Sequence, residues 1–252
     1  MAKLVSWTKF VGTLGGITFY LMNGKHYARQ ARQKNKKRYW LSRLFIGTKK
    51  MNDEFGRAST LSSSFRNLAH TLLYQMDTGY LHSKLSGAFR KIMLTDGNHG
   101  PGKRTLLGGD VSLLRGMEIA KQAQLQNLLG KMPTIQLDQE AGMVKVNFSL
   151  VGFLNPKVIP AGASHYQVKI GIVQFPEKPK VKGKSVFSGE ESYFKRNETM
   201  DQLGEVPISY EPVLKDYLGT VMLGIYFFQE SNGQYYPLKS GGAVRVLKVW
   251  KG

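Results

Sequence analysis

At 252 residues, with 42% hydrophobic and 11% aromatic side chains, the chain can bury a core, which excludes a wholly disordered protein. The absence of cysteine excludes disulfides, thiolate metal sites and a cysteine nucleophile. The formal net charge of +19 favours an anionic partner, and no stretch approaches the roughly 18 apolar residues that a membrane-spanning helix needs.

The positive charge is concentrated in the N-terminal half. Residues 1–131 hold 22 Lys and Arg against 6 Asp and Glu, whereas residues 132–252 hold 14 against 11. The first 52 residues carry 12 basic side chains and no acidic one. Cations that serve only solubility would occur in both halves, so this asymmetry indicates a surface for an anionic partner.

The N-terminal segment predicts a β-hairpin. Residues 17–22 alternate in polarity, Asn23-Gly24 follows, and residues 25–29 continue as a second strand. Asn-Gly favours a two-residue type I′ turn, in which both residues have positive φ. A secretory signal is the alternative for residues 10–22, but the glycines and threonines within the run disfavour it. We therefore expect a cytoplasmic protein.

A basic segment with interspersed aromatic side chains runs from Lys25 to Lys50. Lys and Arg neutralise phosphates, and aromatic rings stack on exposed bases. The candidate nucleic-acid-binding residues are Lys25, Tyr27, Arg29, Arg32, Lys34, Lys36, Lys37, Arg38, Tyr39, Arg43, Lys49 and Lys50. Trp40 is either a stacking platform or a core anchor, and Leu44 one helical turn later favours the core role.

Helices are expected next. Apolar residues recur at three- and four-residue steps from Phe65 to Met76 and from Leu81 to Met93, which predicts a helical hairpin. Ser62, Ser63 and Ser64 are candidate N-caps of the first helix. A third helix is predicted over residues 112–129.

A glycine-rich loop lies between these helices. Residues 97–103 match the phosphate-loop pattern G-x-x-x-x-G-K, but Arg104 stands where Ser or Thr must hold magnesium. The loop also follows a helical segment instead of a strand. We interpret it as a connecting loop that carries Lys103 and Arg104.

After Pro133 the apolar period changes from 3.6 to 2. Alternating or continuous apolar runs at residues 144–150, 166–172, 217–228, 234–238 and 243–250 predict strands, and residues 177–195 read as an exposed loop. The prediction is an α+β protein. Residues 1–131 form a basic hairpin-plus-helical region, and residues 132–252 form an antiparallel β-sandwich of the immunoglobulin or fibronectin type.

Candidate catalytic groups are sparse. The five histidines show no metal-ligand spacing, although His70 and His82 could meet across the helical hairpin. No nucleophile is paired with a base in the sequence. We expect neither catalysis nor a metal or other cofactor.

Several short motifs resemble a family of uncharacterised Bacteroidota proteins of similar length. They are Leu14-Gly15-Gly16, Phe19-Tyr20, Asn23-Gly24-Lys25, Glu54-Phe55-Gly56 and the run from Pro160 to His165. The resemblance extends over most of the chain, although Ser164 stands where members usually carry Thr. It implies a cytoplasmic bacterial protein with the same two-part layout, and it implies no activity or catalytic residue.

The combined prediction is a non-enzymatic protein that binds nucleic acid, DNA or RNA, without sequence preference through its basic N-terminal half. The auxiliary cations for this binding would be Lys84, Arg90, Lys91, Lys103 and Arg104. The alternative is a structural subunit of a filament or phage-like particle, in which the basic arm contacts an acidic protein surface or another copy of the chain. A surface without a partner is the third interpretation, and no membrane contact is expected.

Overall fold

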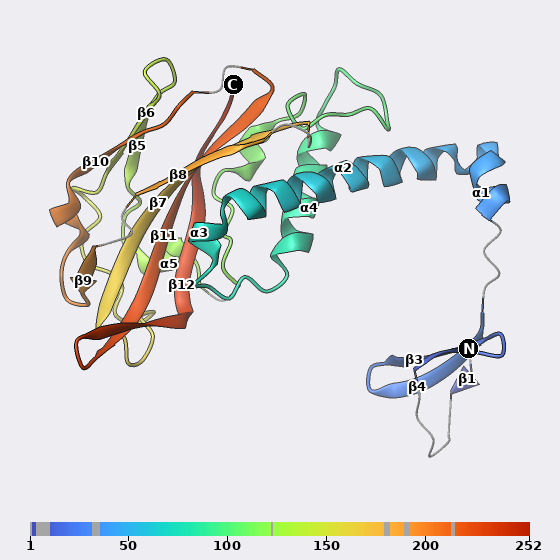
Figure 1. The fold of residues 1–252 in the computed structure, drawn as a ribbon, viewed down its shortest axis with the longest axis horizontal. Helices are drawn as coiled ribbons and strands as arrows, with labels where there is room; N and C mark the ends of the chain where they lie inside the picture. The colour runs from blue at the N-terminus through green and yellow to red at the C-terminus, as the bar shows by residue number, and fades with distance from the viewer. Residues whose placement is uncertain are drawn as a thin grey trace. The chain divides into compact units, whose positions relative to one another are not determined.

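The computed structural model describes residues 2–3, 11–31, 36–121, 123–178, 182–188, 192–212 and 215–252 (Figure 1). Helices and antiparallel sheets together make this an α+β protein. The chain divides into two compact units, Met1–Gly47 and Thr48–Gly252. The boundary expected after residue 131 lies inside the second unit, and the unit boundary falls 84 residues earlier, at residue 47.

The first unit is a small antiparallel sheet followed by a short helix. Its strands are β1 (Ala2–Lys3), β2 (Gly12–Leu14), β3 (Ile17–Met22) and β4 (Lys25–Gln30), in the order β1-β4-β3-β2. Asn23 and Gly24 have φ of 51° and 72°, so the expected hairpin turn is confirmed. The helix α1 (Lys36–Leu41) precedes the 3₁₀ turn η1 (Arg43–Phe45).

The expected helical hairpin is present, with an earlier start. Its helices are α2 (Ile46–Leu68), α3 (His70–Leu73) and α4 (Leu81–Leu94). Ser62 is buried within α2, where its hydroxyl donates to the His82 carbonyl oxygen at 3.3 Å. The N-cap prediction for the three serines is therefore wrong, because Ala58 and Leu61 extend the buried stripe of α2 toward its N-terminus.

The strands of the second unit form two antiparallel sheets. The smaller contains β5 (Thr134–Asp138), β6 (Met143–Asn147) and β10 (Glu205–Ser209), in the order β10-β6-β5. The larger has the order β12-β11-β7-β8, with β9 also paired to β7. Its strands are β7 (His165–Pro176), β8 (Lys184–Ser188), β9 (Tyr193–Lys195), β11 (Tyr217–Ser231) and β12 (Gln234–Lys251). The 3₁₀ turn η3 (Met200–Leu203) precedes β10 of the smaller sheet.

The larger sheet is the middle layer of the second unit. On one face, Phe175, Met222 and Val246 pack with the helices, including Phe89 of α4. On the other face, core residues of β7 and β11 pack with Val146 of the smaller sheet. Helices thus cover a face that an immunoglobulin-type sandwich would leave to solvent, and the assignment to that type remains a prediction.

The predicted third helix is wrong. Among the described residues of 112–129, the helical elements are the turn η2 (Val111–Leu114) and the short helix α5 (Leu125–Leu128). Between them the backbone runs beside β12, where the Gly116 N–H donates to the Val246 oxygen and the Ile119 N–H donates to the Val244 oxygen, each at 2.8 Å. Pairing with a sheet edge replaced the helix that the apolar spacing predicted.

Within the described part of the chain, every helix is too short or too polar to cross a lipid bilayer.

Candidate nucleic-acid interface

One face of the N-terminal sheet brings aromatic rings and cations together. Tyr20 of β3 pairs with Tyr27 of β4, and their rings stack with centroids 5.9 Å apart and an interplanar angle of 24°. The Arg29 guanidinium lies over the Tyr20 ring, 5.3 Å from its centroid. Residues two apart on a strand share a face. Lys25, two residues before Tyr27 and paired with Met22, therefore lies on this face too.

The sequence around this face contains no acidic residue that could compensate its positive charge. Lys25 and Arg29 are exposed, and the two tyrosines are half-buried. No Asp or Glu occurs before Asp53. Exposed cations attract phosphates, and half-buried rings offer a flat apolar surface for bases. We call Tyr20, Lys25, Tyr27 and Arg29 the basic aromatic face.

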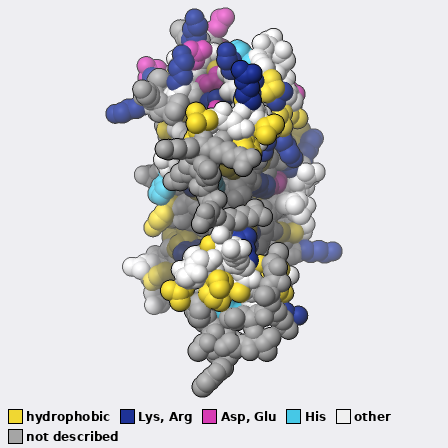
Figure 2. Space-filling view, turned by 90° about the vertical axis from the view of Figure 1, so that its right-hand side faces the viewer, with side chains coloured by type: hydrophobic (Ala, Val, Ile, Leu, Met, Phe, Trp, Pro, Cys, Tyr) yellow, Lys and Arg dark blue, Asp and Glu magenta, His cyan; other side chains and the backbone are white. Residues whose placement is uncertain are grey.

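The opposite face of the same sheet carries exposed apolar side chains, with His26 and Gln30 as its polar members on β4. Leu14, Ile17 and Leu21 are 70%, 43% and 54% exposed, and the register pairs Leu14 with Ile17. Figure 2 shows one side of the molecule, on which hydrophobic side chains (yellow) and Lys and Arg side chains (dark blue) are both exposed. The two faces of the sheet therefore differ in chemistry.

The helix α1 does not anchor a core, contrary to the prediction for Trp40. Trp40 and Leu44 are 66% and 87% exposed. The helix ends at Leu41, and the hydroxyl of Ser42 accepts from the Leu44 N–H at 3.3 Å as the chain enters η1. The one-turn spacing between Trp40 and Leu44 is lost there. Tyr39 is half-buried, with its ring 5.2 Å from that of Phe45.

The structure gathers only part of the predicted binding set. Lys25, Tyr27 and Arg29 are brought together on the basic aromatic face, which Tyr20 completes although the sequence reasoning omitted it. The others fall elsewhere: Arg32 and Lys34 lie outside the described residues; Lys36, Lys37, Arg38 and Tyr39 belong to α1; Arg43 belongs to η1; and Lys49 and Lys50 lie on α2 in the second unit.

Two of the proposed auxiliary cations have structural partners. Lys84 donates to the backbone oxygen of Glu118, and a guanidinium nitrogen of Arg104 lies 3.9 Å from Glu54. These contacts engage both cations within the fold.

The glycine-rich loop is held by a buried carboxylate. Asp96 accepts hydrogen bonds from the backbone N–H groups of Thr105 and Asn98 at 2.8 and 2.9 Å. The Thr105 hydroxyl also donates to it at 3.2 Å, and His99 Nδ1 lies 2.8 Å from its carboxylate. The hydrogen bond from the Thr105 N–H is the largest cause that holds the pKa of Asp96 well below its usual range. This carboxylate thus closes the loop on itself.

Two further carboxylates hold the same loop from distant positions. Glu54 of α2 is fully buried and accepts from the Gly102 N–H at 2.7 Å, and Glu177 accepts from the Leu106 N–H at 2.5 Å. Burial raises the pKa of Glu177. The N–H of Gly102 is therefore occupied by a protein carboxylate instead of being open to a phosphate.

The loop also has the wrong structural setting for a nucleotide. It follows the helix α4, whereas a phosphate loop follows a strand. Sequence reasoning missed Glu54, although its spacing to Ala58, Leu61 and Phe65 places it on the buried stripe of α2. An acid at a core position of a helix was the available signal.

The motif at residues 160–165 forms a junction between strands. His165 is buried, with Nδ1 3.0 Å from the Ser164 hydroxyl and 3.6 Å from Glu230 Oε2. The Ser164 oxygen in turn accepts from the Glu230 N–H at 2.7 Å. The Ser164 hydroxyl and the Glu230 carboxylate both lie near Nδ1 of His165, whereas in a catalytic triad the serine and the carboxylate contact opposite nitrogens of the histidine ring. The arrangement ties β7 to β11.

The other histidines do not assemble a site in the described residues. His70 and His82 do not pair: the His70 ring lies 5.8 Å from that of Tyr74, and His82 Nε2 lies 3.2 Å from the Ser59 hydroxyl. Across the part of the chain that the structure describes, no three His, Asp or Glu side chains gather as a metal site.

Comparison of the chain with protein-family models, with curated proteins and with solved structures found no match.

Proposed function

We propose that this protein binds single-stranded nucleic acid without sequence preference, through the basic aromatic face of its N-terminal sheet. The observation that carries the proposal is the stacked pair of Tyr20 and Tyr27 between two exposed cations, Lys25 and Arg29. A strand bound there would place phosphates on the cations and bases on the rings.

Chemistry at this face favours a single strand over a duplex. The rings of a half-buried aromatic pair reach only bases whose faces are open, and a duplex hides those faces in its stack. Every base has such a face, so stacking gives affinity without sequence preference. Lys25 and Arg29 add attraction that depends on salt.

The first prediction tests the cations of this face. In Lys25→Gln/Arg29→Gln, the slope of log affinity against log salt for a single-stranded oligonucleotide should become shallower by about 1.4, because each lost phosphate contact contributes about 0.7. Fluorescence anisotropy with labelled oligothymidylate over a salt series measures the slope. Lys157→Gln, an exposed lysine of the second unit, is the control.

An unchanged slope in the double variant would exclude this face as the binding site. Failure of the wild-type chain to bind single-stranded DNA or RNA at low salt would exclude the function altogether. In that case the assembly function becomes the better explanation.

The apolar face of the same sheet supports that second candidate function. Leu14, Ile17 and Leu21 expose neighbouring apolar surface, and such patches mark protein contacts. If the chain self-assembles through them, light scattering should show a larger species in the wild type than in Leu14→Ser/Leu21→Ser, with no effect of nuclease treatment. Equal sizes for the two proteins would exclude this face as the contact.

A further inference from the structure

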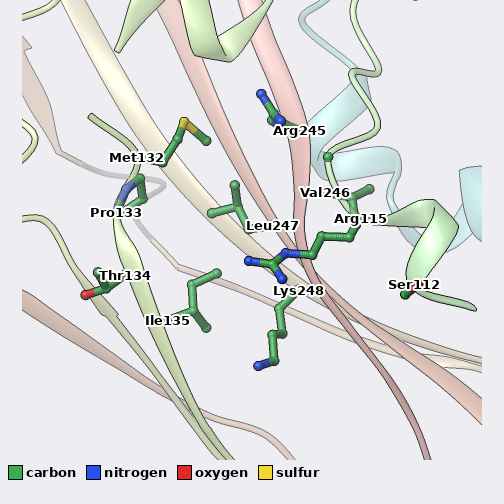
Figure 3. Close-up of a pocket in the computed structure, with 11 residues that line it drawn as sticks. Ser112, Arg115, Met132, Pro133, Thr134, Ile135, Arg245, Val246, Leu247 and Lys248 are labelled. Carbon is green, nitrogen blue, oxygen red and sulfur yellow. The ribbon is translucent and has the colours of Figure 1, made fainter. Parts of the chain in front are cut away.

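A hollow in the second unit opens where the edges of its two sheets meet. It has a volume of about 640 Å³ and lies between the turn after η2, the start of β5 and the strand β12 (Figure 3). Both β5 and β12 are edge strands of their sheets. The volume is within the range of about 300–1,000 Å³ found for small-molecule sites, and far exceeds that of a single ion.

A β-bulge directs a lysine into this hollow. Val221 pairs with Lys248 and the next residue, Met222, pairs with Val246, so Leu247 is an extra residue in β12. Val221 belongs to the core beneath the smaller sheet, and Lys248 therefore shares that face with Leu247. Regular alternation would have turned Lys248 toward the helices. Figure 3 shows Leu247 and Lys248 together among the lining residues.

The second cation comes from the neighbouring turn. Arg115 follows η2, and its backbone position is fixed because the next N–H, that of Gly116, donates to the Val246 oxygen at 2.8 Å. In Figure 3 the Arg115 guanidinium extends toward the middle of the lining residues. Neither Arg115 nor Lys248 has a side-chain hydrogen bond or ion pair with any residue that the structure describes.

The third cation of the lining is already neutralised. One guanidinium nitrogen of Arg245 contacts Glu118 Oε1 at 3.1 Å and Gln126 Oε1 at 2.9 Å. Among the residues that the structure describes, no Asp or Glu lines the hollow itself. Two uncompensated cations on separate elements thus face the same space, which favours a ligand group with two negative charges over a monocarboxylate.

The remaining lining residues indicate the chemistry of the rest of the ligand. Met132, Ile135 and Leu247 supply apolar surface, and Ser112 and Thr134 supply hydroxyls at the margin. We propose that this hollow binds a small phosphate monoester, with the phosphate on Arg115 and Lys248 and an apolar organic part against Met132, Ile135 and Leu247. This site is independent of the nucleic-acid interface proposed for the first unit.

Phenyl phosphate combines the two chemistries and is the probe. Titrated into the ¹⁵N-labelled full chain, it should shift the amide signals of Gly116, Val246 and Lys248 saturably. Arg115→Ala and Lys248→Ala should each weaken this binding by about tenfold or more, because each removes a charge-assisted hydrogen bond. Lys239→Ala removes an exposed lysine of the same strand outside the hollow and should leave binding unchanged.

Parallel titrations decide the ligand class. Inorganic phosphate should shift the same amides with weaker affinity, since it lacks the apolar part. Benzoate binding as tightly as phenyl phosphate would overturn the phosphate assignment, and so would oligothymidylate shifting these amides when phenyl phosphate does not. No saturable shift with phenyl phosphate, or equal loss in Lys239→Ala, would overturn the site. Lys248→Gln keeps the side-chain length and replaces Lys248→Ala if the latter fails to fold.

Discussion

At the scale of single residues, the buried Asp96 makes stability depend on pH. Its folded-state pKa lies below the unfolded value, chiefly because the Thr105 N–H bonds the ionised form. Its contribution is therefore present above the unfolded pKa of about 3.9 and is lost as pH falls toward the folded value. Asp96→Asn should lower the unfolding free energy by about 1–3 kcal/mol at neutral pH.

Urea unfolding at neutral pH and at low pH checks this prediction. The difference between wild type and Asp96→Asn should shrink as pH falls below the unfolded pKa, because Asp96 then binds a proton in the unfolded chain while it stays ionised in the folded chain. Asp53→Asn changes an exposed carboxylate and should cost about 0.5 kcal/mol or less. A difference that is the same at both pH values would contradict the ionic role of Asp96.

Sequence patterns predicted some residues of the candidate interface and of the glycine-rich loop, and missed others for physical reasons. The Asn23-Gly24 turn and the alternation before it predicted the hairpin of β3 and β4, and the register of these strands puts Lys25, Tyr27 and Arg29 on one face. The contact of Glu177 with the Leu106 N–H joins positions 71 residues apart. No local pattern encodes such a contact, because it exists only once the sheet and the loop have packed.

At the scale of elements, the short helix α1 decides the role of Trp40. With its side chain 66% exposed, Trp40→Ala should change the unfolding free energy by about 0.5 kcal/mol or less. If Trp40 is a stacking platform for a base, the same change should weaken single-strand binding by about 1–3 kcal/mol. Thermal unfolding and anisotropy on one protein sample separate the two effects.

An exposed aromatic of the second unit provides the comparison. Tyr80 is 84% exposed, and Tyr80→Ala should affect neither stability nor oligonucleotide binding. A loss of several kcal/mol of stability in Trp40→Ala would instead restore the core role that its sequence spacing suggested.

The prediction of helices succeeded where the buried residues lie close together in the sequence. It failed where pairing with the edge of a sheet competed with the helix. The stripes of α2 and α4 follow from three- and four-residue spacing. Residues 112–129 show similar spacing, but Gly116 has a φ of +81° and its N–H bonds to β12. The bulge at Leu247 was equally hidden, since it is defined by the pairing of β12 with β11.

At the scale of the whole molecule, the change of period at Pro133 does not mark a boundary between units. The helices before it and the strands after it share one core, in which Phe65 of α2 contacts Phe175 of β7 with ring centroids 5.4 Å apart. The Tyr226 hydroxyl also donates to the Leu72 oxygen at 2.6 Å. The helical layer therefore belongs to the same cooperative unit as the larger sheet.

Two fragments test this cooperativity. Residues 48–252 should fold, whereas residues 132–252 should not, because removal of the helices exposes Phe175, Met222, Val244 and Val246. At about 1.5–3 kcal/mol per large apolar side chain, that loss is comparable with the total stability of about 5–15 kcal/mol of a typical domain. Circular dichroism and thermal unfolding of both fragments give the readout. A cooperative transition in residues 132–252 would show that the sheets are stable without the helices, and the boundary would then belong after residue 131.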